Sequence, residues 1–143
     1  MQPGIASLVL ATQDSELEAV LSAPAISLIG FESPPETASE RERFQLARES
    51  LQQGEALLRF NTEAACRLRI AEVQTGSPSR GRILSARYRF SCAAPERLRS
   101  VAVSVFLAFP RLQRLFVRYA ITGLRGEAEA RWANPLITFI PLF

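Results

Sequence analysis

Apolar and polar residues alternate in two runs that flank a turn-like segment near the middle of the chain. In residues 66–70, a cysteine, a leucine and an isoleucine alternate with two arginines, and in residues 84–92 apolar side chains and a cysteine alternate with serine and arginine. Such alternation is typical of a β-strand with one buried face. Residues 75–82 between the runs have the glycine, proline and serine content of a turn. We therefore predict a β-hairpin across residues 66–92.

One pairing of the two strands keeps their apolar side chains on a single face. With the turn centred on Ser79, the facing pairs are Cys66 with Cys92, Leu68 with Phe90 and Ile70 with Tyr88. A slip of one residue would turn the apolar set of one strand to the wrong face. Because the chain has two cysteines and this register brings them together, we predict a disulfide at the base of the hairpin; two buried free thiols are the alternative.

The same pattern predicts further strands along the chain. They are residues 5–12 and 16–22, which form a hairpin, followed by residues 101–105, 115–121, 127–132 and 136–140. Residues 25–31 are apolar, and we interpret them as a buried connection. Residues 122–126 have turn composition. We expect six to eight strands in a mainly antiparallel sheet.

One amphipathic helix is predicted over residues 37–53. Thr37 and Glu40 have the spacing of a capping box, and Gly54 suits the C′ position after the last turn. The apolar stripe consists of Phe44, Ala47 and Leu51. One or two short helical turns complete the prediction. The fold class is α+β, with a single domain over residues 1–143.

Composition excludes several classes of function. The chain has 143 residues, of which 48% are hydrophobic and 22% charged, as in an ordinary globular domain. All 17 basic residues are arginine and the net charge is +3, which is too small to predict a nucleic-acid partner. Histidine is absent, so the chain lacks the commonest general base and the commonest metal ligand. No stretch approaches the roughly 20 apolar residues that span a bilayer.

The predicted disulfide points to an oxidising compartment. Met1-Gln2-Pro3 contains no basic residue, and the apolar run of residues 5–11 is more typical of a strand than of a signal peptide. If the protein is exported, we expect that its signal peptide has been removed from this chain.

Few residues suit catalysis or metal binding. Without histidine no Ser/His/Asp or Cys/His set can form, and residues 75–82 lack the spacing and the lysine of a phosphate-binding loop. Glu127 and Glu129 could aim two carboxylates at a substrate, but solvated residues balanced by Arg131 are the favoured interpretation. The cysteines lack C-x-x-C spacing, which favours a structural disulfide over a redox pair, and thiols joined only by carboxylates are a poor zinc set. We predict no catalytic residue, no metal ligand and no cofactor.

Arginines gather on the outward face of the predicted hairpin. The set consists of Arg67, Arg69, Arg87 and Arg89 on the strands with Arg80 and Arg82 near the tip. Six guanidinium groups could bind an anionic surface through bidentate hydrogen bonds. The alternative is a solvated strand face neutralised by Glu63, Glu72 and neighbouring carboxylates.

Two apolar features near the end of the chain have similar alternatives. We expect Trp132 to pack in the core at the end of the sheet rather than to form a ligand platform. The tail, residues 136–143, is expected to pair with the sheet rather than to bind a partner.

Several segments, taken in order, resemble the ZrgA-like family, bacterial periplasmic accessory proteins of zinc uptake long described as a domain of unknown function. The segments are Gly4-Ile5-Ala6, residues 17–25, residues 28–32, Cys66-Arg67-Leu68, Tyr88-Arg89-Phe90-Ser91-Cys92, residues 106–110, Leu115-Phe116-Val117 and Asn134-Pro135. They extend over nearly the whole chain. Residues 22–25 and 30–32 together with the two cysteines are the most specific part of the resemblance.

The resemblance implies an exported protein that collects zinc through a histidine-rich segment between its two cysteines and through histidines at its N-terminus. In this chain the first place holds residues 75–82, and Gln2-Pro3 stands where a histidine pair would be expected before Gly4. The resemblance therefore implies the fold and the periplasmic compartment but no zinc ligand. Either this is a natural member without the histidine-rich segment, or the segment was removed; the sequence is compatible with both.

We accordingly expect a non-enzymatic exported accessory protein of zinc uptake whose histidine-rich chelating loop is absent. Its candidate partner is a periplasmic metal-uptake component, and the sequence defines no oligomeric state. The alternative is an interaction module that uses the arginine-rich hairpin face to bind an acidic partner or a membrane surface. An enzyme with a carboxylate pair is a third hypothesis, which the missing bases disfavour.

Overall fold

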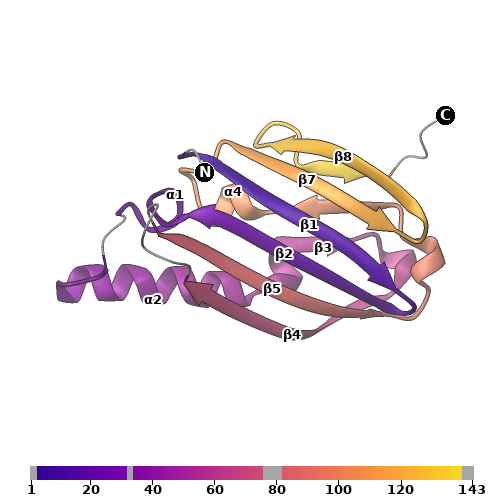
Figure 1. Cartoon of the computed structure of the whole chain (residues 1–143), viewed down its shortest axis with the longest axis horizontal. Helices are drawn as coiled ribbons and strands as arrows, with labels where there is room; N and C mark the ends of the chain where they lie inside the picture. Colours follow the sequence, from indigo (N-terminus) through magenta and orange to yellow (C-terminus); the bar gives the residue numbers. More distant parts are fainter. Residues whose placement is uncertain (1–2, 32–33, 76–81, 140–143) are drawn as a thin grey trace.

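The computed structural model describes residues 3–31, 34–75 and 82–139. A six-stranded sheet forms the front layer of the molecule (Figure 1). Its strands, in spatial order, are β4 (Cys66–Thr75), β5 (Ile83–Cys92), β2 (Glu16–Pro24), β1 (Ile5–Gln13), β7 (Arg114–Ile121) and β8 (Leu124–Arg131). The predicted hairpin of the first two strands is confirmed as β1 and β2. The turn predicted over residues 122–126 is shorter than expected, because β8 already begins at Leu124.

The sheet is mixed, which corrects the prediction of a mainly antiparallel one. Strands β1 and β7 run parallel, with Leu8 beside Val117, whereas the other neighbouring strands of this sheet run antiparallel. Parallel neighbours need a crossover connection. Here β4 and β5 join the sheet on the β2 side, and the chain then crosses over to place β7 on the other side of β1. Alternation along each strand does not determine which strands become neighbours, so the sequence pattern could not predict this pairing.

A second sheet of three short strands lies behind the first (Figure 1) and consists of β3 (Leu58–Phe60), β6 (Ser100–Val103) and β9 (Leu136–Thr138). The described residues therefore hold nine strands rather than six to eight. The predicted strands at residues 101–105 and 136–140 belong to this sheet, and the first of them ends early because Val105 begins a helix. Residues 76–81, within the predicted turn, and residues 140–143 of the apolar tail lie outside the described residues.

The predicted amphipathic helix is confirmed as α2 (Ala38–Gln52). The Thr37 hydroxyl accepts a hydrogen bond from the Glu40 backbone amide, and the Glu40 carboxylate accepts one from the Thr37 amide, so both halves of the capping box form. Ala47 and Leu51 are buried as predicted, and Phe44 packs at the edge of the core.

Short helices are more numerous than predicted. They are α1 (Ala25–Ile29), α3 (Gly54–Leu57) and α4 (Val105–Ala108), with single 3₁₀ turns at Thr62–Ala64 and Pro95–Arg97. The apolar segment interpreted as a buried connection is α1, and most of its residues are buried. Pieces of four or five residues bury too few side chains to leave a periodic signal in the sequence, so they could not be distinguished from loops.

Gly54 follows the C-cap residue Gln53 and so stands at the predicted C′ position of α2, but without the left-handed backbone that is typical of that position. It begins α3 and is buried against Tyr88 of β5, where a Cβ atom would lie 2.6 Å from the ring carbon Cδ1. Glycine is therefore needed here for a close approach between helix and sheet rather than for a left-handed backbone.

The core lies between the six-stranded sheet on one side and α2 with the three-stranded sheet on the other (Figure 1). The inward face of the large sheet supplies its largest fully buried side chains, among them Leu8, Leu10, Leu17, Tyr88 and Phe90. On the outward face, residues such as Val9 and Arg87 are exposed. Trp132 is 62% exposed, so the prediction that it packs in the core at the end of the sheet is wrong.

Candidate functional site

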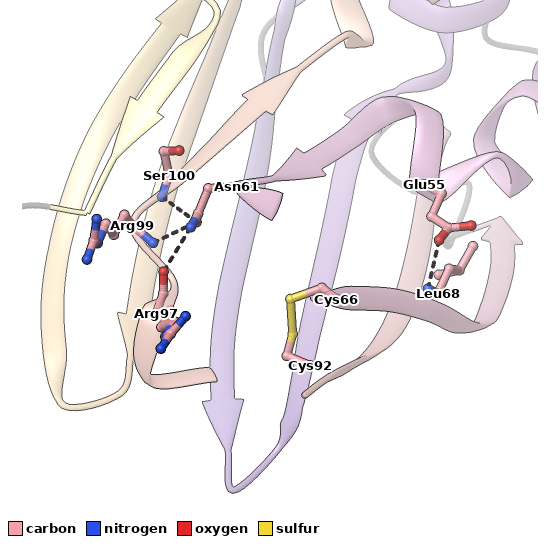
Figure 2. Close-up of a disulfide and its surroundings, with 8 residues drawn as sticks. All are labelled: Glu55, Asn61, Cys66, Leu68, Cys92, Arg97, Arg99 and Ser100. Atoms are coloured by element: carbon pink, nitrogen blue, oxygen red, sulfur yellow. Dashed lines mark hydrogen bonds between the residues drawn. A yellow bond between two sulfur atoms is a disulfide. The ribbon is translucent and has the colours of Figure 1, made fainter. Parts of the chain in front are cut away.

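The predicted hairpin of β4 and β5 is closed by a disulfide between Cys66 and Cys92, which face each other across the two strands (Figure 2). Leu68 faces Phe90, also as predicted. The predicted pairing of Ile70 with Tyr88 is wrong, because a β-bulge between Leu68 and Ile70 shifts the register and places Ile70 opposite Arg89. An extra residue reverses which face the following side chains occupy, so Ile70 is 43% exposed.

Asn61 fastens the chain next to this disulfide (Figure 2). Its side-chain oxygen accepts hydrogen bonds from the backbone amides of Arg99 and Ser100, and its side-chain nitrogen donates to the carbonyl oxygen of Arg97. These bonds join the segment before β4 to the segment after β5. The disulfide end of the hairpin is therefore held by covalent and polar contacts that are structural in character.

The predicted arginine set is divided by the bulge and by the neighbouring strand. Arg67 and Arg69 lie on the edge strand β4, and Arg87 and Arg89 lie on β5. The residues opposite Arg87 and Arg89 on β4 are Glu72 and Ile70 rather than arginines. The facing of Arg69 and Arg89 that the unbroken register implies is therefore absent.

Carboxylates on β2 neutralise the two central arginines. Nε of Arg87 lies 3.7 Å from a carboxylate oxygen of Glu18, and Arg89 lies 3.9 Å from oxygens of both Glu16 and Glu18. The expectation that neighbouring carboxylates balance these arginines is thus met, but by β2 rather than by Glu63. The pairs are exposed and therefore individually weak, yet they reduce the positive charge available to a ligand.

Of the last two arginines of the set, Arg82 lies at the opposite end of the hairpin from the disulfide. Arg82 is half-buried just before β5, and its carbonyl oxygen accepts a hydrogen bond from the backbone amide of Ala25. Arg80 lies outside the described residues.

Glu127 and Glu129 form ion pairs with the neighbouring strand β7. Glu129 accepts a hydrogen bond from Arg114 and lies 3.4 Å from Arg131, while Glu127 lies 3.5 Å from Arg118. The hydrogen bond from Arg114 is the main reason that the pKa of Glu129 lies below its ordinary value. Both carboxylates are thus engaged by arginines of β7 and β8.

Metal-binding chemistry finds little support among the described residues. Over residues 3–31, 34–75 and 82–139, no three histidine, cysteine, aspartate or glutamate side chains come together in a way that could hold a metal ion. Both cysteines are joined to each other in the disulfide. In the same part of the chain, no helix has the length and apolar character to cross a membrane.

Gly4, near the start of the chain, and Arg82, just before β5, lie at the same end of the large sheet. Gly4 precedes β1, and its backbone amide donates a hydrogen bond to the buried hydroxyl of Ser27 on α1. The amide of Ala25, which begins α1, in turn donates to the carbonyl of Arg82 at the far side of the hairpin loop. Helix α1 therefore contacts both Gly4 and Arg82, the described residues next to the two segments at which the resemblance would put histidines.

Two surface hollows were missed by the sequence analysis. One, of about 400 Å³, lies on the outward face of the sheet and is lined by Val9, Arg118 and Glu127 among others. The other lies between α1, α2 and the connection that follows α4, and two arginines, Arg43 and Arg111, line it. The residues that line each hollow come from segments distant in sequence, so no local pattern marks either one. Arg111, which follows Phe109-Pro110, was by itself too weak a signal to predict the second hollow.

Comparison with known proteins adds one match. The family model described as ZrgA family zinc uptake protein matches residues 1–139. No curated protein gives a match. Because the family model extends over almost the whole chain, through both cysteines and the sheet described above, the chain belongs to the ZrgA family of zinc uptake proteins.

Proposed function

We propose that this protein is a non-enzymatic accessory protein of zinc uptake, exported to the periplasm, that does not chelate zinc itself. The match of residues 1–139 to the ZrgA family carries the link to zinc uptake. The absence of histidine from all 143 residues carries the second half of the proposal, because zinc sites in proteins depend on histidine and thiolate ligands.

The state of the cysteines and carboxylates supports this proposal. Zinc binds thiolates, and the sulfurs of Cys66 and Cys92 are bonded to each other. Glu129 forms ion pairs with Arg114 and Arg131. Glu18 forms ion pairs with Arg87 and Arg89. A disulfide between neighbouring strands also fits an oxidising compartment such as the periplasm. The partner would then be a component of the uptake machinery that supplies the zinc ligands.

Calorimetric titration of the full chain with zinc tests the absence of a chelating site. We expect no site with micromolar or tighter affinity at neutral pH. A copy carrying a C-terminal hexahistidine tag serves as the positive control and should bind zinc under the same conditions. A micromolar site in the untagged chain would overturn the proposal. The link to zinc uptake is tested separately: deleting the gene in its bacterium should slow growth when zinc is chelated in the medium, and normal growth would contradict that link.

The alternative function, an interaction module built on the arginine-rich hairpin face, remains a prediction. Arg67 and Arg69 lie on the edge strand, where a partner has access, but Arg87 and Arg89 are paired with Glu16 and Glu18. Reversing Arg69→Glu and Arg89→Glu together would abolish binding to anionic phospholipid vesicles if this module operates. Under the accessory-protein proposal, the same double variant supports growth in zinc-poor medium as well as the natural chain does.

A further inference from the structure

A groove between three helical segments combines an apolar floor with two guanidinium groups. We call it the helical groove and define it by Leu28, Arg43, Leu46, Phe109 and Arg111. Leu28 comes from α1, Arg43 and Leu46 come from α2, and the last two residues follow α4. Figure 1 shows α1, α4 and the beginning of β1 at the same end of the sheet, with α2 extending towards them from below. The groove measures about 340 Å³ and is open to solvent.

The charge of the helical groove is one-sided. Its lining includes Arg43 and Arg111 but no carboxylate, and within the described residues neither guanidinium group forms an ion pair. The nearest negative charge to Arg43 is that of Glu40 on α2, whose carboxylate is held mainly by backbone hydrogen bonds to Glu36 and Thr37. On the outward face of the sheet the situation differs, because Arg87, Arg114 and Arg118 each pair with a glutamate. The helical groove is thus complementary to a negatively charged group.

The position of Arg111 is set by the fold. Gly30 ends α1 with a left-handed backbone, at φ +89°, and a Cβ atom there would lie 3.0 Å from Nη2 of Arg111. The guanidinium group therefore rests on the bare backbone of Gly30, at the edge of the groove. An arginine held in this way loses less side-chain entropy when it binds a carboxylate than a freely moving one does.

The apolar part of the groove is also incompletely covered. Leu46, which lines the groove, is 55% exposed although it lies beside the buried Ala47. An exposed leucine that lines a groove beside an arginine offers apolar contact to a partner that also carries a negative charge.

We propose that the helical groove binds a segment of a partner protein in which an apolar side chain is flanked by glutamate or aspartate. The apolar side chain would lie over Leu28 and Phe109, and the carboxylates would pair with Arg43 and Arg111 through charge-assisted hydrogen bonds. A small metabolite is a poorer fit, because small-molecule sites enclose most of the ligand surface and this groove is shallow. The inference rests on the proposed function to the extent that the partner is a component of zinc uptake.

Titration of the ¹⁵N-labelled full chain with the capped peptide Glu-Leu-Leu-Glu, followed by NMR, tests the inference. We expect millimolar binding, with the largest chemical-shift changes at backbone amides of the helical groove, including Leu46 and Ala108. The capped peptides Gln-Leu-Leu-Gln and Lys-Leu-Leu-Lys should bind at least about fivefold more weakly. Equal affinity for the three peptides, no shift at millimolar peptide, or shifts confined to β4 and β5 would each overturn the inference.

Matched arginine variants separate the groove from general positive charge. Arg43→Gln and Arg111→Gln should each weaken binding of Glu-Leu-Leu-Glu by about five- to tenfold. Arg48→Gln removes the same charge from an exposed position of α2 outside the groove and should have little effect. Because Arg111 contacts Gly30, its variant is first checked for an unchanged circular dichroism spectrum, and Arg43→Gln keeps the test valid if that check fails. If Arg48→Gln weakened binding as much as Arg43→Gln, the inference would be wrong. These peptide measurements do not depend on zinc. The groove could therefore fail to bind the peptide while the link to zinc uptake holds, and it could bind the peptide even if that link were wrong.

Discussion

The hydroxyl of Tyr88, in the centre of β5, donates a hydrogen bond to the backbone carbonyl oxygen of Leu51 near the end of α2. Both side chains are fully buried. The bond therefore fastens the main helix to the large sheet at a point where water cannot replace it, and it also satisfies a carbonyl group at a helix end, where partners within the helix are missing.

Removing this hydroxyl should destabilise the protein without disturbing its packing. Tyr88→Phe leaves the Leu51 carbonyl without this donor in a buried place, so we expect the free energy of unfolding to fall by about 1–2 kcal/mol. Urea unfolding followed by circular dichroism measures the change. Tyr119→Phe is the control, because Tyr119 is also largely buried but, in the part of the chain that the structure describes, its hydroxyl makes no hydrogen bond to a backbone carbonyl. A loss no larger than that of the control would contradict the structural role given to the bond.

The same residue predicts a dependence on alkaline pH. Burial raises the pKa of the Tyr88 hydroxyl in the folded protein, whereas in the unfolded chain it ionises at about 10. The neutral form is favoured by folding, so its stabilising contribution is complete below pH ~10 and is lost as the pH rises above that value. The stability of the natural chain should therefore decline more steeply than that of Tyr88→Phe over this range, as measured by urea unfolding at successive pH values. Parallel curves would show that Tyr88 is not the residue responsible.

Gly54→Ala tests the close approach of α3 to the sheet. Alanine normally stabilises a helix relative to glycine by roughly 0.5–1 kcal/mol, but here its Cβ would meet the ring of Tyr88. We expect a net destabilisation of about 1–3 kcal/mol, measured as a lower midpoint of thermal unfolding. Gln52→Ala, at an exposed position of α2, should leave the midpoint nearly unchanged. A stabilised Gly54→Ala variant would mean that the two segments lie farther apart than described.

The disulfide should contribute a large share of the stability. Replacing both Cys66 and Cys92 with alanine opens a cross-link between positions 26 residues apart, and the chain-entropy model gives a loss of roughly 3–4 kcal/mol. Guanidinium unfolding of the natural chain and the double variant measures the loss. Dithiothreitol should destabilise the natural chain by a similar amount and leave the double variant unaffected. An unchanged midpoint in the double variant would show that the rest of the fold compensates for the cross-link.

Glu129 should contribute to the loss of stability in acid. The hydrogen bond from Arg114 lowers the pKa of Glu129 in the folded protein, so its contribution is present above the ordinary pKa of a glutamate and is lost as the pH falls through the lowered value. The natural chain should be more stable than Glu129→Gln at neutral pH, and the difference should close in acid. Glu127→Gln is the control, because the Glu127–Arg118 pair is more exposed and should show a smaller difference. A gap that persists in acid would point to packing rather than charge.

Features that depend on neighbouring residues in the chain were predictable. The capping box of Thr37 and Glu40 involves residues three positions apart, and the buried face of each long strand follows from alternation along that strand. The pairing of Cys66 with Cys92 could also be predicted, because a hairpin joins strands that are adjacent in sequence and one register keeps both apolar faces inward. The bulge next to Arg69 was not predicted, although the alternation changes phase between Ile70 and Ala71, so that Ala71 and Val73 are the residues that pack against the core.

The candidate sites depended more on distant segments. Glu16 and Glu18 neutralise Arg87 and Arg89 because β2 lies beside β5, and alternation does not specify which strands become neighbours. The helical groove likewise brings Arg43 and Arg111 together from separate parts of the chain. Trp132 remained exposed although it followed an alternating run, because its position lies beyond the end of β8.

The sequence by itself determined the β-rich character of the protein, the main helix with its cap, the cysteine pair, and the lack of any histidine to bind zinc or transfer a proton. Only the tertiary structure decided the order of the strands, the parallel pairing of β1 with β7, and which arginines of the described residues form ion pairs with a carboxylate. The reason is physical: backbone periodicity and capping are local, whereas the neighbours of a charged side chain are set by the packing of segments distant in the chain.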